Sequence, residues 1–209
     1  MLGRHYLPGA LWHAHELLFG FALAVIVGFL LTAGRTWSNR PTATGVLLMA
    51  LVVLWLTARV LVLTPWGWAA ALVNTVFPMS AAIALAIPFH AARNRRNYFF
   101  VGLLLMITAA VLTFHLARLQ FLTLPSWLGI QVALDVVLFI MAVISGRVIP
   151  LFTNNGVPGA LTARQASIKR TALGSVLALL LTDALQVRGA PLAALLAFRA
   201  VSHLARWLL

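Results

Sequence analysis

The residues best suited to chemistry lie close together near the start of the chain, in the segment Trp12-His13-Ala14-His15-Glu16. A long apolar run, 17–33, begins directly after them. Ionisable side chains at or inside a membrane span are costly to bury, so a chain that keeps them there usually uses them. Two imidazoles and a carboxylate can bind a metal ion or a haem iron, with Glu16 orienting a histidine ligand. The structural alternative is that the histidines lie at the membrane interface and Glu16 makes a polar contact.

Helical geometry separates these three side chains. At about 100° per residue, His13 and Glu16 share one face of a helix, and His15 points roughly the other way. Small residues follow Glu16 at steps of four: Gly20, Ala24 and Gly28. Such a stripe lets another helix approach closely. We therefore expect Glu16 and His13 to face the protein interior, and His15 to join them only if the first turn is not helical.

Other ionisable residues interrupt later apolar runs. His115 is either a further ligand or a hydrogen-bonded interfacial histidine. Arg59 and Asp135 resemble an ion pair, because either alone in lipid costs about 2.5–3.5 kcal/mol on insertion scales. A structural lock between two helices and a substrate or proton role both remain open for that pair. Arg147 precedes Pro150, where we expect its helix to end, and is a candidate for binding a haem propionate or a lipid phosphate.

The composition indicates that these groups are surrounded by membrane. The chain has 209 residues, of which 63% are hydrophobic and 9% charged, whereas a soluble domain is about half apolar and about a quarter charged. Fifteen lysines and arginines against three acids give a net charge of +12. These cations lie in short gaps between apolar runs, as in the cytoplasmic loops of membrane proteins, which argues against nucleic-acid binding. The absence of cysteine excludes disulfides, iron–sulfur clusters, thiolate zinc sites and covalently attached c-type haem.

Seven apolar runs satisfy or approach the length of about 20 residues that a spanning helix needs. They lie at about 11–33, 45–63, 68–89 (interrupted by Pro78), 98–119, 127–149, 171–185 and 191–209. The expected fold class is therefore all-α, a polytopic transmembrane bundle of about six to seven helices in a single domain over residues 1–209. The loops after the first, third and fifth runs hold most of the cations, which predicts that they are cytoplasmic and that the N-terminus is outside.

Two motifs resemble signatures of a known family. The first combines Trp12-His13-Ala14-His15-Glu16 with Phe19-Gly20-Phe21-Ala22 and Gly28-Phe29-Leu30-Leu31-Thr32-Ala33, and the second combines Gly146-Arg147-Val148-Ile149-Pro150 with Phe152-Thr153 and Asn155. Both strongly resemble the NnrS family, and Arg95-Arg96-Asn97-Tyr98-Phe99 is similar to a third, weaker signature. Family members usually carry one span before the first motif and several after the last run, so we expect a partial member or part of a larger architecture.

The resemblance implies a bacterial inner-membrane protein that binds haem b, copper or both and acts in the response to nitric oxide. The candidate cofactor-binding residues are His13, His15, His115 and Arg147, and the candidate metal ligands are His13, His15 and Glu16. Arg59 and Asp135 would brace this site as a structural ion pair. The expected partners are the lipid bilayer and other membrane helices or a second copy of the chain, and not nucleic acid. Whether the protein is an enzyme stays open.

Two alternatives come from different classes. The first is a metal-free transporter or channel-like membrane subunit, in which Glu16, Arg59 and Asp135 line a proton or solute path. The second is a truncated family member that has lost its activity.

Overall fold

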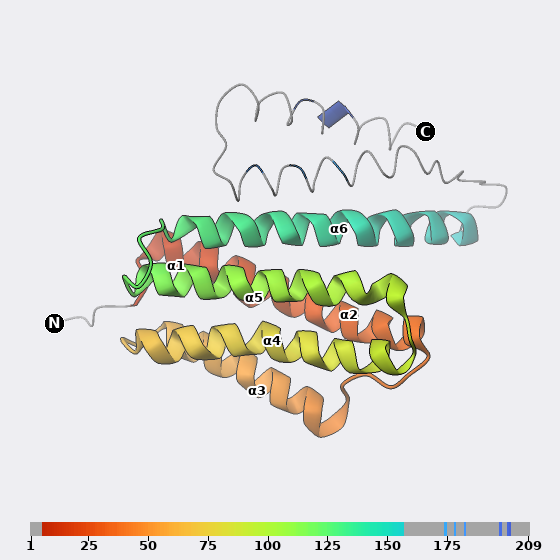
Figure 1. Ribbon diagram of the computed structural model, residues 1–209, viewed down its shortest axis with the longest axis horizontal. Coiled ribbons are helices and arrows are strands. Elements are labelled where there is room, and N and C mark those ends of the chain that lie inside the picture. Colours follow the sequence, from red (N-terminus) through yellow and green to blue (C-terminus); the bar gives the residue numbers. More distant parts are fainter. Residues whose placement is uncertain are drawn as a thin grey trace. The chain divides into compact units, whose positions relative to one another are not determined.

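The structure is a computed structural model that describes residues 6–156 and a few isolated later positions. Its elements follow one another as α1 (Gly9–His15), η1 (Glu16–Ala22), α2 (Leu23–Ser38), α3 (Gly45–Val62), α4 (Gly67–Ala91), η2 (Arg95–Asn97), α5 (Tyr98–Arg118) and α6 (Trp127–Gly156) (Figure 1). Every element in this part of the chain is helical, η1 being a π-helical segment and η2 a 3₁₀ turn. The predicted all-α class is confirmed.

Five of the described helices are long and apolar enough to cross a membrane. They are Gly9–Ser38, Gly45–Val62, Gly67–Ala91, Arg95–Arg118 and Trp127–Ile149. They correspond to the first five predicted spans, so the described count is a little below the expected six to seven. The predicted spans 171–185 and 191–209 lie outside the described residues. The protein is an integral membrane protein by the length and hydropathy of these helices.

Two expectations about helix ends are wrong. Pro78 does not interrupt its span, because α4 runs through it and through Pro88, and α6 continues past Pro150 to Gly156. Proline removes one backbone hydrogen bond, but neighbouring groups in a membrane protein can satisfy the carbonyl that it frees. The end of α2 depends on a different residue: Asn39 takes a left-handed conformation with a φ of 50°, which asparagine adopts at helix ends more readily than most residues.

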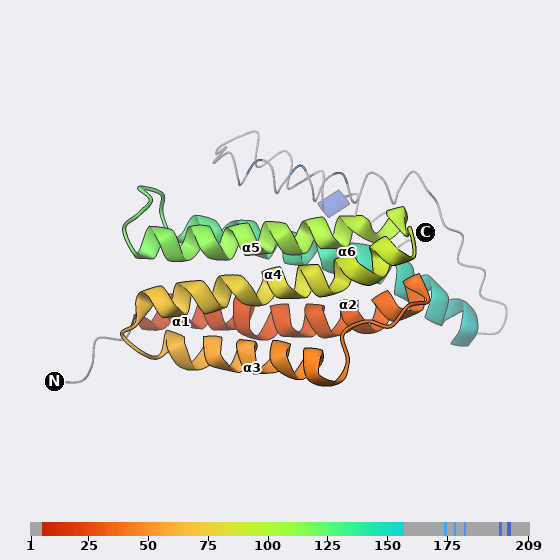
Figure 2. The same ribbon diagram turned by 60° about the horizontal axis from the view of Figure 1, so that its bottom comes forward.

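The chain divides into two compact units, Met1–Ala133 and Leu134–Leu209, and the prediction of a single domain stays a prediction. The first unit contains α1 to α5 and the first turns of α6. Within it, α4 packs against α2, α3 and α5, and Figure 2 shows α4 between α5 and the helices of the first span. Helix α3 lies at the edge, and most of its apolar side chains are exposed. These side chains face lipid.

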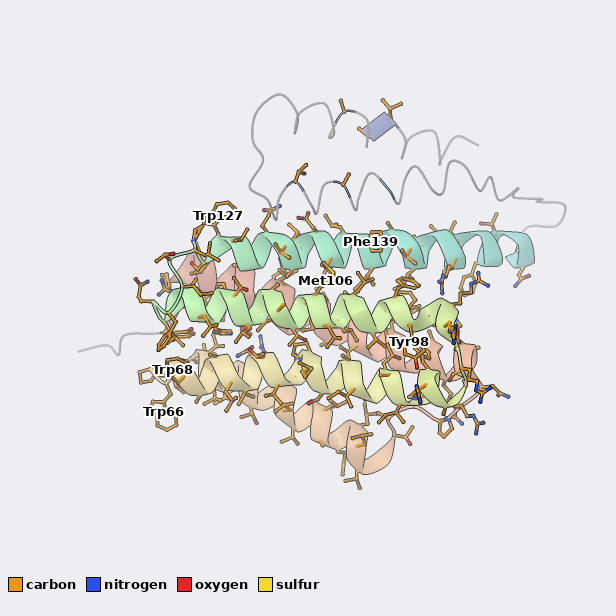
Figure 3. The ribbon with its side chains drawn as sticks, viewed as in Figure 1. Trp66, Trp68, Tyr98, Met106, Trp127 and Phe139 are labelled. Carbon is orange, nitrogen blue, oxygen red and sulfur yellow. The ribbon has the colours of Figure 1, made fainter. Side chains whose placement is uncertain are left out.

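Aromatic residues mark one end of the first unit. Trp66, Trp68 and Trp127 are exposed, and they lie where α4 and α6 begin (Figure 3). Tryptophan prefers the interface between membrane and water, so this end is close to a membrane surface. Helices α1 and α5 also have one terminus here, since α1 begins and α5 ends on the same side as the start of α4.

The first turn of α6 approaches α5 closely at a glycine. A Cβ atom at Gly129 would lie 2.5 Å from the carbonyl oxygen of Ala110 and 2.8 Å from the backbone nitrogen of Phe114. Because both atoms belong to the α5 backbone, they cannot move aside cheaply. Glycine at position 129 therefore permits the close contact between the first turn of α6 and α5 within the first unit.

Candidate functional site

Two histidines that are distant in sequence meet inside the first unit. His15 is the last residue of α1 and His115 lies in the last turn of α5, and both are 0% exposed. Their Nε2 atoms lie 3.3 Å apart. The rings of Phe19 and Phe114 pack against the His15 ring, each with a centroid distance of 5.1 Å. The two Nε2 atoms therefore face each other in an apolar enclosure.

Each histidine also has an oxygen partner on its other ring nitrogen. His15 Nδ1 lies 2.9 Å from Glu16 Oε1, and His115 Nδ1 lies 3.0 Å from the Tyr6 hydroxyl. With Glu16 ionised, His15 Nδ1–H donates to the carboxylate, and His15 Nε2 accepts from His115 Nε2–H. His115 Nδ1 then accepts from the Tyr6 hydroxyl. A single arrangement of protons satisfies all four ring nitrogens.

Tyr6 precedes the first span and lies over His115. The two rings stack with centroids 5.7 Å apart and planes 7° apart, and Arg118 donates to the Tyr6 carbonyl oxygen at 3.3 Å. Gly67 makes room for the tyrosine, because a Cβ atom there would lie 2.7 Å from the Tyr6 ring. Burial raises the pKa of Tyr6 to about 12, although the Arg118 charge opposes this shift. The hydroxyl is therefore protonated at neutral pH and can donate.

Glu16 pairs with an arginine from a different helix. Arg59, in the last turn of α3, donates from Nη1 to Glu16 Oε1 at 2.7 Å. Its Nη2 donates to the side-chain oxygen of Asn74 in α4, and Asn74 in turn donates to the carbonyl oxygen of Ala70 at 2.8 Å. Either charge alone in lipid would cost about 2.5–3.5 kcal/mol. The pairing therefore explains how this apolar unit retains both charges, and it joins η1, α3 and α4.

Gly20 leaves room for the Arg59 side chain of α3. A Cβ atom at Gly20 would lie 2.7 Å from Arg59 Nη1, and Trp55 of α3 donates to the Gly20 carbonyl oxygen at 2.9 Å. The predicted stripe of small residues is therefore used at Gly20. It is not used further along the span, because Ala24 is half-buried and Gly28 is exposed with nothing near its Cβ position.

The structure brings together four of the predicted site residues, which are His15, Glu16, Arg59 and His115. Two expectations about the inward face of this span are wrong. His13 was expected to face the interior and is exposed, whereas His15 was expected to point the other way and is buried. The buried side of this span follows the large apolar residues Leu18, Phe19 and Leu23. Lipid accepts apolar side chains as readily as a protein core does, so periodicity alone did not distinguish the two faces.

Two predicted roles concern residues of the second unit and stay predictions. Asp135 is buried and Arg147 is half-buried, both in the part of α6 beyond Ala133. Arg59, the predicted partner of Asp135, binds Glu16 and Asn74 within the first unit. Among the residues that the structure describes, Arg59 Nε has no hydrogen-bond acceptor.

The sequence prediction missed Asn74 and Tyr6. Asn74 did carry a signal, because it is a single amide within the apolar run 67–91, and a polar residue inside a span indicates a specific contact. Tyr6 carried none. It lies before the first span, and no spacing in the sequence relates it to His115.

A comparison with protein-family models decides the family. The model described as "NnrS protein" matches residues 1–209, the whole chain. The chain belongs to the NnrS family. Comparison with curated proteins and with solved structures found no match. The first NnrS motif supplies His15 and Glu16 of the buried cluster, and the motif around Arg147 lies in α6.

Proposed function

We propose that this NnrS-family membrane protein binds one copper ion between His15 and His115 and acts in the bacterial response to nitric oxide. The proposal depends on one observation above all, the pair of buried Nε2 atoms that face each other at 3.3 Å. Imidazole is a good ligand for copper. A histidine that binds a metal usually donates its second N–H to an oxygen, and the Glu16 carboxylate and the Tyr6 hydroxyl oxygen are available as these acceptors.

The distance between the ligands favours a single ion over a haem. Metal–nitrogen bonds of about 2.0–2.1 Å at tetrahedral angles separate two nitrogens by about 3.3–3.4 Å, close to the observed 3.3 Å. A haem between two axial histidines needs about 4 Å, twice such a bond, and a wide gap between the rings. The pair fits an ion and does not fit a haem. In the described part of the chain no third His, Cys, Asp or Glu completes a cluster, so the described residues offer these two histidines as ligands.

A bound copper ion supplies one-electron chemistry, which suits nitric oxide because this molecule is a radical. The residues of the chain keep the two ligands in position. Glu16 orients His15 and is itself held by Arg59, while Tyr6 orients His115 and covers it. The phenylalanine rings around His15 exclude water. Ligands that are already oriented lose little conformational entropy when the ion binds.

The metal content of detergent-purified protein tests the proposal. We expect about one copper per chain after anaerobic loading and desalting, and loss of that copper in His15→Ala and in His115→Ala. His13→Ala is the matched control, because this histidine is exposed and only two residues from His15. It is expected to keep its copper. In cells treated with a nitric oxide donor, the first two variants are expected to lose protection and the control to keep it.

Three outcomes contradict the copper site. In the first, His15→Ala and His115→Ala retain copper at the stoichiometry of the unmodified protein. In the second, folded protein binds no metal, which favours the metal-free transporter or channel. In the third, a haem Soret band is present and is lost in His13→Ala, which supports the ligand set predicted from the sequence. Circular dichroism of each variant shows that the loss of metal is not a loss of fold.

The proposed location is the bacterial inner membrane, with the N-terminus and the histidine pair near the outer face. Exposed arginines in the connections after the first and third spans support this orientation. The chain has no cysteine, so Ser126→Cys provides a single label between α5 and α6. We expect this cysteine to react with a membrane-impermeant maleimide in spheroplasts. Reaction only after the membrane is opened would reverse the orientation.

A further inference from the structure

Five exposed arginines lie at the end of the first unit opposite the histidine pair. They come from three segments that are separate in sequence: Arg35 in α2, Arg40 in the connection to α3, and Arg93, Arg95 and Arg96 in the connection between α4 and α5. Figure 3 shows side chains that end in nitrogen gathered at this end, near Tyr98. We call this group the arginine end. The copper site uses none of its residues.

Hydrogen bonds and ring stacking hold these segments together. Asn94, between Arg93 and Arg95, donates to the Trp37 carbonyl oxygen at 2.8 Å, which ties the α4–α5 connection to the last turn of α2. The Trp37 ring stacks on Phe100 of α5, with centroids 5.2 Å apart. Arg93 has a φ of 51°, a conformation that non-glycine residues rarely adopt. The arginines therefore project from defined backbone positions.

The first unit contains no acid that neutralises the arginine end. Glu16 is the only acid in residues 1–133, and it lies at the opposite end in contact with His15 and Arg59. Charges within a Debye length of about 8–10 Å repel one another in physiological salt. The arginine end therefore favours an anion from outside this unit.

The surroundings of the arginine end identify the anion as a lipid. Exposed apolar side chains lie within about a turn of it on three helices: Val46 and Leu47 on α3, Ile87 on α4 and Phe99 on α5. A soluble phosphate makes no use of such a surface. A phospholipid does, because its acyl chains pack on these side chains while its phosphate reaches the guanidinium groups.

We propose that the arginine end binds the headgroup of an anionic phospholipid. Guanidinium groups pair with phosphate through two parallel hydrogen bonds, and basic clusters next to membrane spans attract anionic lipids. A zwitterionic lipid has the same phosphate but carries its own cation. The site therefore prefers phosphatidylglycerol over phosphatidylcholine, and this preference does not depend on whether copper binds at the other end.

Lipid titration of delipidated protein, followed by native mass spectrometry, tests this site. We expect phosphatidylglycerol to bind at a concentration at least about ten-fold lower than phosphatidylcholine. The triple variant R93Q/R95Q/R96Q is expected to bind phosphatidylglycerol roughly a hundred-fold more weakly, since each basic residue near an anionic membrane contributes about five-fold. The matched variant R93K/R95K/R96K keeps the three charges and is expected to stay within about ten-fold of the unmodified protein.

Each of three results overturns the proposal. Equal binding of the two lipids would show that the site does not prefer an anionic headgroup. Unchanged binding in the glutamine variant would show that the arginines do not bind the lipid. Displacement of the lipid by millimolar inorganic phosphate assigns the site to a soluble anion. Where circular dichroism shows that the triple variant is unfolded, the single variants Arg40→Gln and Arg95→Gln take its place, because both positions are exposed. Each of them is expected to weaken binding about five-fold.

Discussion

The contact between Glu16 and Arg59 is expected to contribute more to the stability of the first unit than an ordinary polar contact in a membrane protein. A double-mutant cycle with Glu16→Ala, Arg59→Leu and the combined variant isolates it. Glu16 Oε1 accepts from Arg59 at 2.7 Å and from His15 at 2.9 Å. The contact with His15 is present in both the unmodified protein and Arg59→Leu, so it cancels from the coupling energy.

The magnitude follows from the burial of the pair. Hydrogen bonds between membrane helices contribute about 0.6 kcal/mol on average, because the unfolded chain in the membrane also finds partners. A hydrogen bond to a charged group contributes about 1.5–3 kcal/mol, and the two side chains are only 15% and 21% exposed. We expect each single variant to lose about 2–3 kcal/mol of unfolding free energy, and the coupling to be about 2 kcal/mol.

Equilibrium unfolding in mixed micelles, with sodium dodecyl sulfate as denaturant, measures these energies. The double variant is then expected to lose about 3 kcal/mol, less than the sum of the single losses. Arg93→Leu combined with Glu16→Ala is the control, because Arg93 lies at the arginine end and shares no partner with Glu16. If the losses of Glu16→Ala and Arg59→Leu sum to the loss of the double variant within about 0.5 kcal/mol, the two side chains are not coupled and the reasoning is refuted.

Three further predictions concern the positions around the histidines. Gly67→Ala places a Cβ atom 2.7 Å from the Tyr6 ring; it is expected to displace Tyr6 and weaken copper binding about 10–100-fold in a chelator competition. Gly129→Ala meets the α5 backbone and is expected to lose about 1–3 kcal/mol in micelle unfolding, whereas Gly102→Ala, with nothing near its Cβ position, is expected to lose none. Tyr6 has a pKa near 12 in the folded protein against 10 when unfolded, so metal-free protein should lose stability as the pH rises from 10 to 12. Tyr6→Phe should abolish that loss.

The positions of the helices could be predicted because the length of an apolar run is fixed by the thickness of the membrane. The expected span 45–63 is the helix Gly45–Val62, and the expected span 98–119 is Tyr98–Arg118. The approach of His115 and Arg59 to the first motif was also predictable in outline, since all of them lie near the same ends of their spans. Depth along a span follows from counting residues, and counting does not need a tertiary structure.

The rotation of each helix and the choice of partners could not be predicted in the same way. His15 rather than His13 is buried, because the face that packs on α5 is lined by large apolar residues, and the same residues suit lipid equally well. The contact of Arg59 with Glu16 and Asn74 was not predicted, and the predicted pair of Arg59 with Asp135 stays a prediction. Which partners an arginine meets depends on how the helices pack, and at Gly20 the missing side chain leaves room for the Arg59 guanidinium group.

If the proposed copper ion binds, the histidine pair would pass from the metal-free to the metal-bound form without leaving a buried ring nitrogen unsatisfied. In the metal-free form, Tyr6 donates to His115 Nδ1 and the two Nε2 atoms share a proton. With an ion held by both Nε2 atoms, His115 would adopt its other neutral tautomer: the proton of its Nε2 would be relocated to Nδ1, with no net proton lost, and the Tyr6 hydroxyl oxygen would accept from Nδ1–H. His15 donates to Glu16 in both forms. A buried ring nitrogen without a partner would cost about 1–3 kcal/mol. His115 Nδ1 therefore needs a partner that can either donate or accept, whereas His15 Nδ1 needs only an acceptor. Tyr6 and Glu16 meet these two requirements.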